Sequence, residues 1–267
     1  MVKLLRLRHY AYRTEQTYVE WVERYLKYVA GQGLAWNEPS SVRVWLSYLA
    51  LQRKVASSTQ NQALAAVLFL FRDTLKIDVG EVNAVRAKRG PKLPVVLSVD
   101  EVRALLSETE GMAGLMLRLI YGGGLRISDA LRLRVQDLDF DGSLLFVRAG
   151  KGDKDRATIL PERLVPELKT HLEQVRALHE QDLAKGFGAV YLPNALALKY
   201  PNAPKEWKWQ YVFPAKNLSV DPRSGQTRRH HVSDSLLQSA IKKAVAAAGI
   251  HKHVTVHTLR HSFATHL

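Results

Sequence analysis

A basic, proline-containing stretch from Arg86 to Pro94 constrains the folding of this chain more than any other feature. Proline has no backbone N–H to donate, so Pro91 and Pro94 prevent a helix from continuing through this stretch. Apolar residues recur at helical spacing before it, and a helix-capping box, Ser98-Val99-Asp100-Glu101, follows it. The predicted organisation is a helical domain over 1–88, a basic linker over 89–97 and a second domain over 98–267.

The first domain is predicted to be helical throughout, because its apolar residues form stripes with a period near 3.6. The first stripe follows Thr14, a candidate N-cap, and Gly31 ends it. The three stripes are Tyr18, Trp21, Val22, Tyr25, Leu26 and Val29; Val42, Trp45, Leu46 and Leu49; and Leu64, Val67, Leu68, Phe71 and Leu75. A helical core explains their aromatic residues better than base stacking does.

The second domain is predicted to mix helices with a small antiparallel sheet. Two short apolar runs, Leu144–Val147 and Ala157–Leu160, flank a polar connection and indicate a β-hairpin. Helical patterns follow over about 161–184 and 233–248. An irregular segment rich in aromatic residues and proline lies between them, at about 186–226.

The composition limits the possible partners of the chain. Its 39 Lys and Arg outnumber 25 Asp and Glu, giving a net charge of +14, which favours a polyanion. The longest purely apolar run, Ala63–Phe71, is too short to span a bilayer, and the N-terminus lacks the pattern of a signal peptide. The absence of cysteine excludes disulfides, cysteine zinc sites and thiol nucleophiles. These features predict a soluble intracellular, cytoplasmic protein that binds nucleic acid and no membrane.

Four side chains could cut a phosphodiester without a metal: Arg126, Lys151, His257 and Arg260. Arginine suits the phosphate clamp, because its planar fork meets two oxygens and keeps its charge. Lysine suits the general acid, because nearby cations lower its pKa. Arg126 follows three glycines and begins a helix, where a phosphate would meet both the guanidinium and free helix amides.

Other interpretations exist for each of these residues taken singly. Arg126 could be an exposed arginine after a glycine-ended helix, and Lys151 could be a solvated loop charge. His257 and His261 have the four-residue spacing of zinc-binding helices. The glutamate that a zinc hydrolase needs directly after the first histidine is replaced by Thr258, so we predict no metal site.

Taken together and in order, these motifs resemble the tyrosine recombinase family of site-specific DNA integrases. The matching motifs are Gly124-Leu125-Arg126-Ile127-Ser128, Gly150-Lys151-Gly152-Asp153-Lys154-Asp155-Arg156, and the histidine-arginine box from His257 to His266. The resemblance implies a mainly α, two-domain, C-shaped DNA clamp with a small antiparallel β-sheet. A helical SAM-like core-binding domain would precede a mixed α/β catalytic domain.

The resemblance also implies the chemistry. Arg126 and Arg260 would hold the scissile phosphate, Lys151 would protonate the leaving 5′ oxygen, and His257 would accept the proton of the nucleophile. Asp129 occupies the place of an acidic residue that supports the first arginine in this family. A tyrosine would form a 3′-phosphotyrosyl intermediate within a homotetramer on DNA, with no metal or other cofactor.

One subgroup, the integron integrases, is similar over a further segment. Leu198–Ala203, Glu206–Gln210, Phe213-Pro214 and Arg228–Val232 resemble the insertion with which that subgroup holds the unpaired bases of folded single-stranded recombination sites in gene cassettes. Trp207, Trp209 and His231 offer aromatic platforms and positive charge for such bases. Packing of the insertion onto the domain is the competing interpretation for each tryptophan.

No tyrosine follows Arg260, so the nucleophile position of the family is not occupied in these 267 residues. We therefore expect a C-terminally incomplete integron-type integrase that binds recombination sites but does not cleave them. Two alternatives stay open. One is a non-catalytic DNA-binding module or inhibitory truncated integrase, and the other is a duplex-binding transcriptional regulator.

Overall fold

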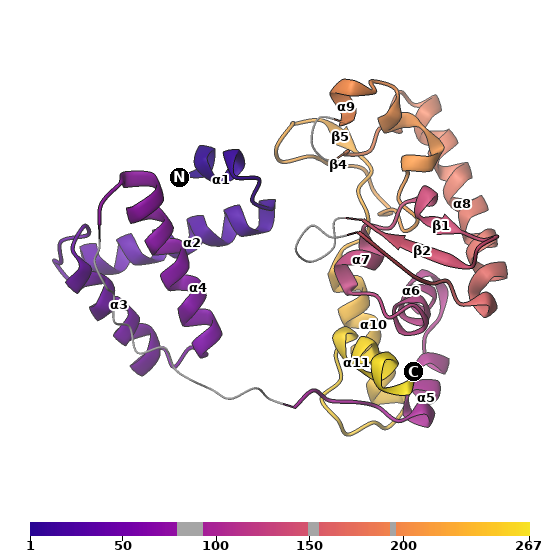
Figure 1. Cartoon of the computed structure of the whole chain (residues 1–267), viewed down its shortest axis with the longest axis horizontal. Coiled ribbons are helices and arrows are strands. Elements are labelled where there is room, and N and C mark those ends of the chain that lie inside the picture. Colours follow the sequence, from indigo (N-terminus) through magenta and orange to yellow (C-terminus); the bar gives the residue numbers. More distant parts are fainter. Residues whose placement is uncertain (79–92, 149–154, 193–195) are drawn as a thin grey trace. The chain divides into compact units, whose positions relative to one another are not determined.

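A computed structural model describes residues 1–78, 93–148, 155–192 and 196–267. The chain folds as two compact units, Met1–Lys92 and Leu93–Leu267, which we call the first and second units (Figure 1). Residues 93–97 of the predicted linker are irregular, and residues 89–92 lie outside the described part. No helix among the described residues is long and apolar enough to cross a membrane.

Helices are the only regular secondary structure among the described residues of the first unit. Its helices are α1 (Val2–Leu7), α2 (Tyr12–Gly31), α3 (Pro39–Leu51) and α4 (Ser57–Leu68), the last continued by a π-helical turn, Phe69–Leu75. The N-cap of α2 is Ala11, so the prediction of Thr14 as the cap is wrong by three residues. The apolar periodicity located this helix but not its first residue. The backbone N–H of Tyr10 donates a hydrogen bond to the carbonyl oxygen of Leu5, which closes the preceding turn just before α2 begins.

The predicted apolar stripes meet in one core between α2, α3 and α4. Trp45 contacts the rings of Trp21 and Tyr25 edge-on, at centroid distances of 6.1 and 5.2 Å. The buried hydroxyl of Tyr25 donates a 2.6 Å hydrogen bond to the Trp36 carbonyl oxygen, and burial raises the pKa of this tyrosine to about 12. These aromatic residues are therefore core residues, as the helical spacing predicted.

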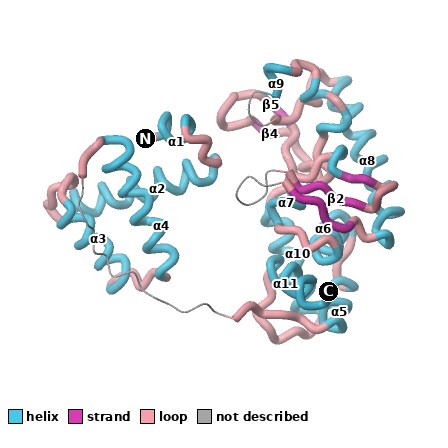
Figure 2. The backbone as a smooth tube through the Cα atoms, in the orientation of Figure 1, coloured by secondary structure: helices cyan, strands magenta, loops and turns pink. Residues whose placement is uncertain are grey.

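The second unit combines seven helices with short strands over its described residues, and Figure 2 shows all strands of the described chain in this unit. Its helices are α5 (Val99–Ser107), α6 (Gly111–Gly122), α7 (Ile127–Leu131), α8 (Val165–Ala184), α9 (Leu196–Lys199), α10 (Asp234–Ala247) and α11 (Val256–His266). Helix α6 is apolar apart from Arg118, which fits its position among α5, α8, α10 and α11. The predicted capping box at Ser98 is present in full, with both hydrogen bonds formed to Glu101.

The predicted hairpin forms the main sheet. Strands β1 (Leu138–Asp139), β2 (Leu144–Val147) and β3 (Arg156–Ile159) pair antiparallel in that order, with Val147 opposite Arg156. A second antiparallel pair, β4 (Ser219–Val220) and β5 (Thr227–Arg228), lies in the irregular segment. The predicted fold class, mainly α with a small antiparallel sheet, is confirmed.

Arg134 fastens the irregular segment 186–226 to the rest of the second unit. Its guanidinium donates hydrogen bonds to the carbonyl oxygens of Trp209 (2.6 Å) and Tyr191 (2.7 Å) and to the Tyr211 hydroxyl (3.2 Å). The guanidinium carbon also lies 3.9 Å from the centroid of the Tyr211 ring. The Arg134 side chain is largely removed from water, and this burial lowers its pKa.

We predict that Arg134→Met destabilises the second unit by about 2 kcal/mol, because it leaves two partly buried carbonyl groups and the buried Tyr211 hydroxyl without this partner. Urea unfolding followed by tryptophan fluorescence measures the change, and hydrogen exchange should increase first in segment 186–226. Arg132→Met, at an exposed position on the neighbouring turn, is the matched control. Equal destabilisation by the two substitutions would show that the buried hydrogen bonds of Arg134 do not hold the segment.

Candidate active site

The first arginine motif is a tight glycine turn between α6 and α7. Gly124 has a φ of +57°, which favours glycine, and a Cβ atom there would lie 2.4 Å from the Phe263 ring of α11. Helix α11 can therefore pack directly against the turn. Arg126 is the N-cap of α7 and keeps 30% of its side chain exposed.

Asp129 is the buried carboxylate of the site, with 1% of its side chain exposed. It accepts a 3.2 Å hydrogen bond from the backbone N–H of Arg126, so this amide is not free, contrary to the expectation of free helix amides. Its Oδ2 also accepts a 2.6 Å hydrogen bond from Arg156 and lies 3.8 Å from the Arg126 guanidinium. The Asp129 carboxylate thus supports Arg126 partly through the backbone N–H of that arginine, and it pairs more closely with the guanidinium of Arg156.

Helix α11 adds the second predicted arginine. Arg260 donates a hydrogen bond to the carbonyl oxygen of Gly124, which joins the two arginine motifs. Partial burial and the charges of Arg126 and Arg156 lower the pKa of Arg260, whereas Asp129 raises it. Three guanidinium groups therefore act on one another around one carboxylate, and they leave a net positive site.

His257 lies one helical turn before Arg260 on α11. Partial burial lowers its pKa, and the nearby His261, Arg260 and Arg126 lower it further. The His257 and His261 rings are perpendicular, with centroids 4.8 Å apart. No group of three or more metal-binding side chains occurs within the described ranges, so this histidine pair has no further acidic or histidine ligand there.

The structure brings together Arg126, His257 and Arg260 of the four predicted site residues. Lys151 falls in residues 149–154, outside the described part. Arg156 is the residue that the sequence analysis did not place in the site. It lies opposite Val147, in the last pair of the β2–β3 ladder before the connection between the two strands, and only the fold reveals that this end of the hairpin faces Asp129.

The three predicted base-binding residues occupy different surroundings. Trp207 packs on α8, 6.1 Å from the His179 ring and beneath Arg176. His231 packs edge-on against Tyr211 at 5.3 Å, and its Nδ1 lies 2.7 Å from the carbonyl oxygen of Val232.

Trp209 lines a cavity of about 180 Å³ together with other aromatic and charged side chains. Arg132 and Arg148 contribute cations to this cavity, and Tyr191 contributes a further ring. Asp129 forms part of its wall, so the cavity adjoins the arginine cluster. Of the two tryptophans, Trp209 alone lines this cavity.

Comparison with known proteins agrees with this geometry. The sequence matches the Phage integrase family over residues 95–267 and the Phage integrase N-terminal SAM-like domain over residues 1–81. An integrase/recombinase of Escherichia coli is 48% identical over 264 residues, which cover 98% of this chain and 78% of the relative.

Two solved structures share the fold. A XerH site-specific recombinase bound to palindromic difH substrate in a post-cleavage complex aligns with a TM-score of 0.60 and 20% identity, over 97% of this chain and 69% of that chain. A lambda integrase tetramer bound to a Holliday junction aligns with a TM-score of 0.57 and 16% identity, over 98% and 66%. The chain therefore belongs to the phage integrase family of tyrosine recombinases, the enzymes of site-specific DNA strand cleavage and rejoining.

Proposed function

We propose that the chain holds DNA and transfers protons in the reaction of an integron-type recombinase, which integrates and excises gene cassettes. The observation that carries this proposal is the cluster of Arg126, Arg156 and Arg260 around the single carboxylate of Asp129. One carboxylate balances one of three cations, so the site attracts an anion with several oxygens. A DNA phosphate has that charge and that geometry.

In this proposal Arg126 and Arg260 hold the non-bridging oxygens of the scissile phosphate. Arg156 is a positioning residue, because its hydrogen bond fixes the carboxylate that orients the Arg126 backbone. His257 accepts the proton of an attacking tyrosine, a role that needs the neutral ring, which the lowered pKa of the free chain favours. Lys151 protonates the leaving 5′ oxygen, and the 3′-phosphotyrosyl bond conserves the energy for rejoining without a cofactor.

The irregular segment supports the integron-type assignment. Its Trp209 lines a cavity beside Asp129, with Arg132 and Arg148 as flanking cations. Aromatic rings with nearby cations bind unpaired bases largely independently of sequence. We propose that an extrahelical base of a folded single strand enters this cavity beside the scissile phosphate, while Trp207 has a packing role.

The proposed partners are DNA, both duplex and folded single strands, and further copies of the same protein. The XerH complex contains its difH substrate, and the lambda integrase tetramer holds a Holliday junction. By analogy with that tetramer, we propose a homotetramer on DNA for this protein.

The proposed function predicts preferential binding to a hairpin with extrahelical bases over a duplex of the same sequence. Trp209→Ala should reduce the hairpin affinity about tenfold, because one stacked base is lost, and should leave duplex affinity nearly unchanged. Trp207→Ala is the matched control and should retain the preference. Gel shifts with both DNAs measure this, and equal affinity of the unsubstituted chain for hairpin and duplex would contradict the integron-type assignment.

Arg260→Ala should weaken binding to a recombination site and reduce the slope of log affinity against log salt by about 1, since one phosphate contact is lost. Arg260→Lys should recover the slope but only part of the affinity, because lysine lacks the planar fork. Fluorescence anisotropy over a salt series measures both quantities. Arg163→Ala, an exposed arginine outside the cluster, serves as the control, and an unchanged slope in Arg260→Ala would remove Arg260 from the clamp.

The protonation of His257 should depend on DNA. In the free chain its pKa lies below the usual 6.5, and a bound phosphate favours the charged ring and raises the pKa. DNA affinity should therefore increase as pH falls through about 6.5, the range in which only the bound form takes up the proton. NMR titration with and without DNA measures the two pKa values. His257→Gln should flatten this part of the affinity profile, and an unaltered profile would show that His257 does not face the phosphate.

A further inference from the structure

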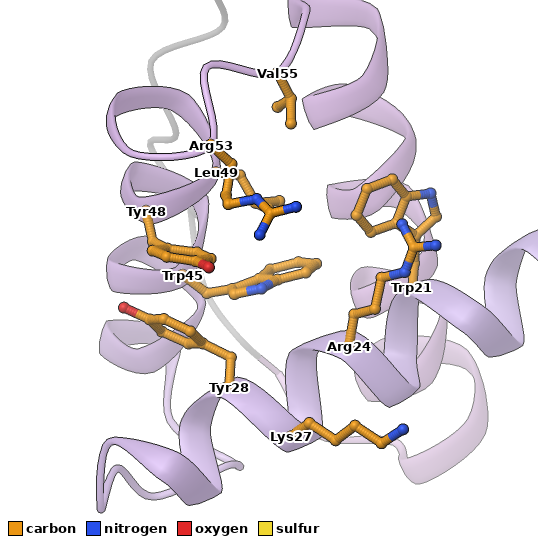
Figure 3. A pocket seen from close by; sticks show the side chains of 9 residues that line it. All are labelled: Trp21, Arg24, Lys27, Tyr28, Trp45, Tyr48, Leu49, Arg53 and Val55. Atoms are coloured by element: carbon orange, nitrogen blue, oxygen red, sulfur yellow. The ribbon is translucent and has the colours of Figure 1, made fainter.

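A hollow of about 550 Å³ lies on the first unit, between the second half of α2, the second half of α3 and the turn that follows α3 (Figure 3). Tyr28 and Tyr48 border one side of it, and Trp21 borders the other. The active-site cluster belongs entirely to the second unit, so the proposed recombination chemistry does not use this hollow.

The floor of the hollow is apolar and already well packed. Trp45 is 1% exposed and Leu49 is 6% exposed, and half-buried Val55 closes the end near the turn. A bulky aliphatic or aromatic side chain placed on this floor would lose contact with water without displacing any core residue.

Three cations surround the floor: Arg24, Lys27 and Arg53, all exposed. In Figure 3 the Arg53 guanidinium lies over Trp45, inside the hollow. Arg24 is 3.8 Å from the exposed carboxylate of Glu20. Among the described residues no ion pair engages Lys27 or Arg53, so two cations at the hollow are available to carboxylates of a ligand.

We propose that this hollow binds an acidic peptide segment of a partner protein through one bulky apolar side chain. The apolar side chain packs against half-buried Val55 and the half-buried rings of Tyr28 and Tyr48 at the border of the floor, and carboxylates on either side of it pair with the surrounding cations. Charge complementarity and an apolar anchor are together the chemistry of a specific peptide groove.

The aromatic contacts favour a peptide over single-stranded DNA. A base needs a free aromatic face, but Tyr28 and Tyr48 already stack on each other at a centroid distance of 4.5 Å. The Arg24 guanidinium covers Trp21 at 4.8 Å, and Trp45 is buried. Carboxylates need only the cations, which remain accessible.

The test is fluorescence anisotropy with the whole chain at physiological ionic strength. The probe is a labelled synthetic peptide of glutamate and glycine with a central Leu-Trp pair, and its counterpart has Ser-Ser at the centre. The Leu-Trp peptide should bind at least about tenfold more tightly, because its counterpart cannot bury an anchor. Arg53→Glu should reduce the affinity for the Leu-Trp peptide at least about tenfold. Arg43→Glu, which lies on α3 but outside the hollow, should change this affinity less than about twofold.

Three results would overturn the proposal. Equal binding of the two peptides, or equal losses in Arg43→Glu and Arg53→Glu, would show only non-specific charge attraction. Oligothymidylate that binds through Arg53 and displaces the peptide would assign the hollow to single-stranded DNA. Concentration-dependent self-association that Arg53→Glu abolishes, without peptide binding, would assign it to a second copy. The recombination-site assays are independent of each of these results.

Discussion

The second unit depends on one electrostatic constraint, the balance of three guanidinium groups by the single buried carboxylate of Asp129. Like charges repel strongly where water is partly excluded, so Arg126, Arg156 and Arg260 can approach one another only because Asp129 lies among them. The carboxylate also orders the α6–α7 turn by accepting a hydrogen bond from the backbone N–H of Arg126. Arg126 and Arg156 each keep 30% of their side chains exposed, so the positive charge of the cluster remains partly accessible to solvent.

The sequence predicted the parts of this arrangement that local periodicity and motifs determine. The hairpin, the helices from about 161 and 233, and the capping box at Ser98 all appear, with boundaries within a few residues. Local pattern could not reveal strands of two residues such as β1, because pairing with β2 alone defines them. The contact between Arg156 and Asp129 joins positions far apart in the sequence, and no spacing rule indicates it.

The irregular segment shows the same limit at single residues. Trp207 and Trp209 lie two apart in one 3₁₀ turn, Trp207–Trp209, and the sequence offers no reason to distinguish them. The fold does so, because Arg134 binds the carbonyl oxygen of Trp209 and holds its ring at the cavity, while Trp207 contacts α8. Both side chains are half-buried, so hydropathy alone cannot distinguish the ring at the cavity from the ring on α8.

The contact between Gly124 and Phe263 has a consequence for how such a protein can diversify. Any side chain at 124 would need both an unfavourable backbone conformation and space that the phenyl ring now fills. Position 124 therefore cannot accept a side chain on its own without separating α11, and with it Arg260, from the turn. Related chains should vary at these two positions jointly, with a smaller residue at 263 arising before 124 accepts a side chain.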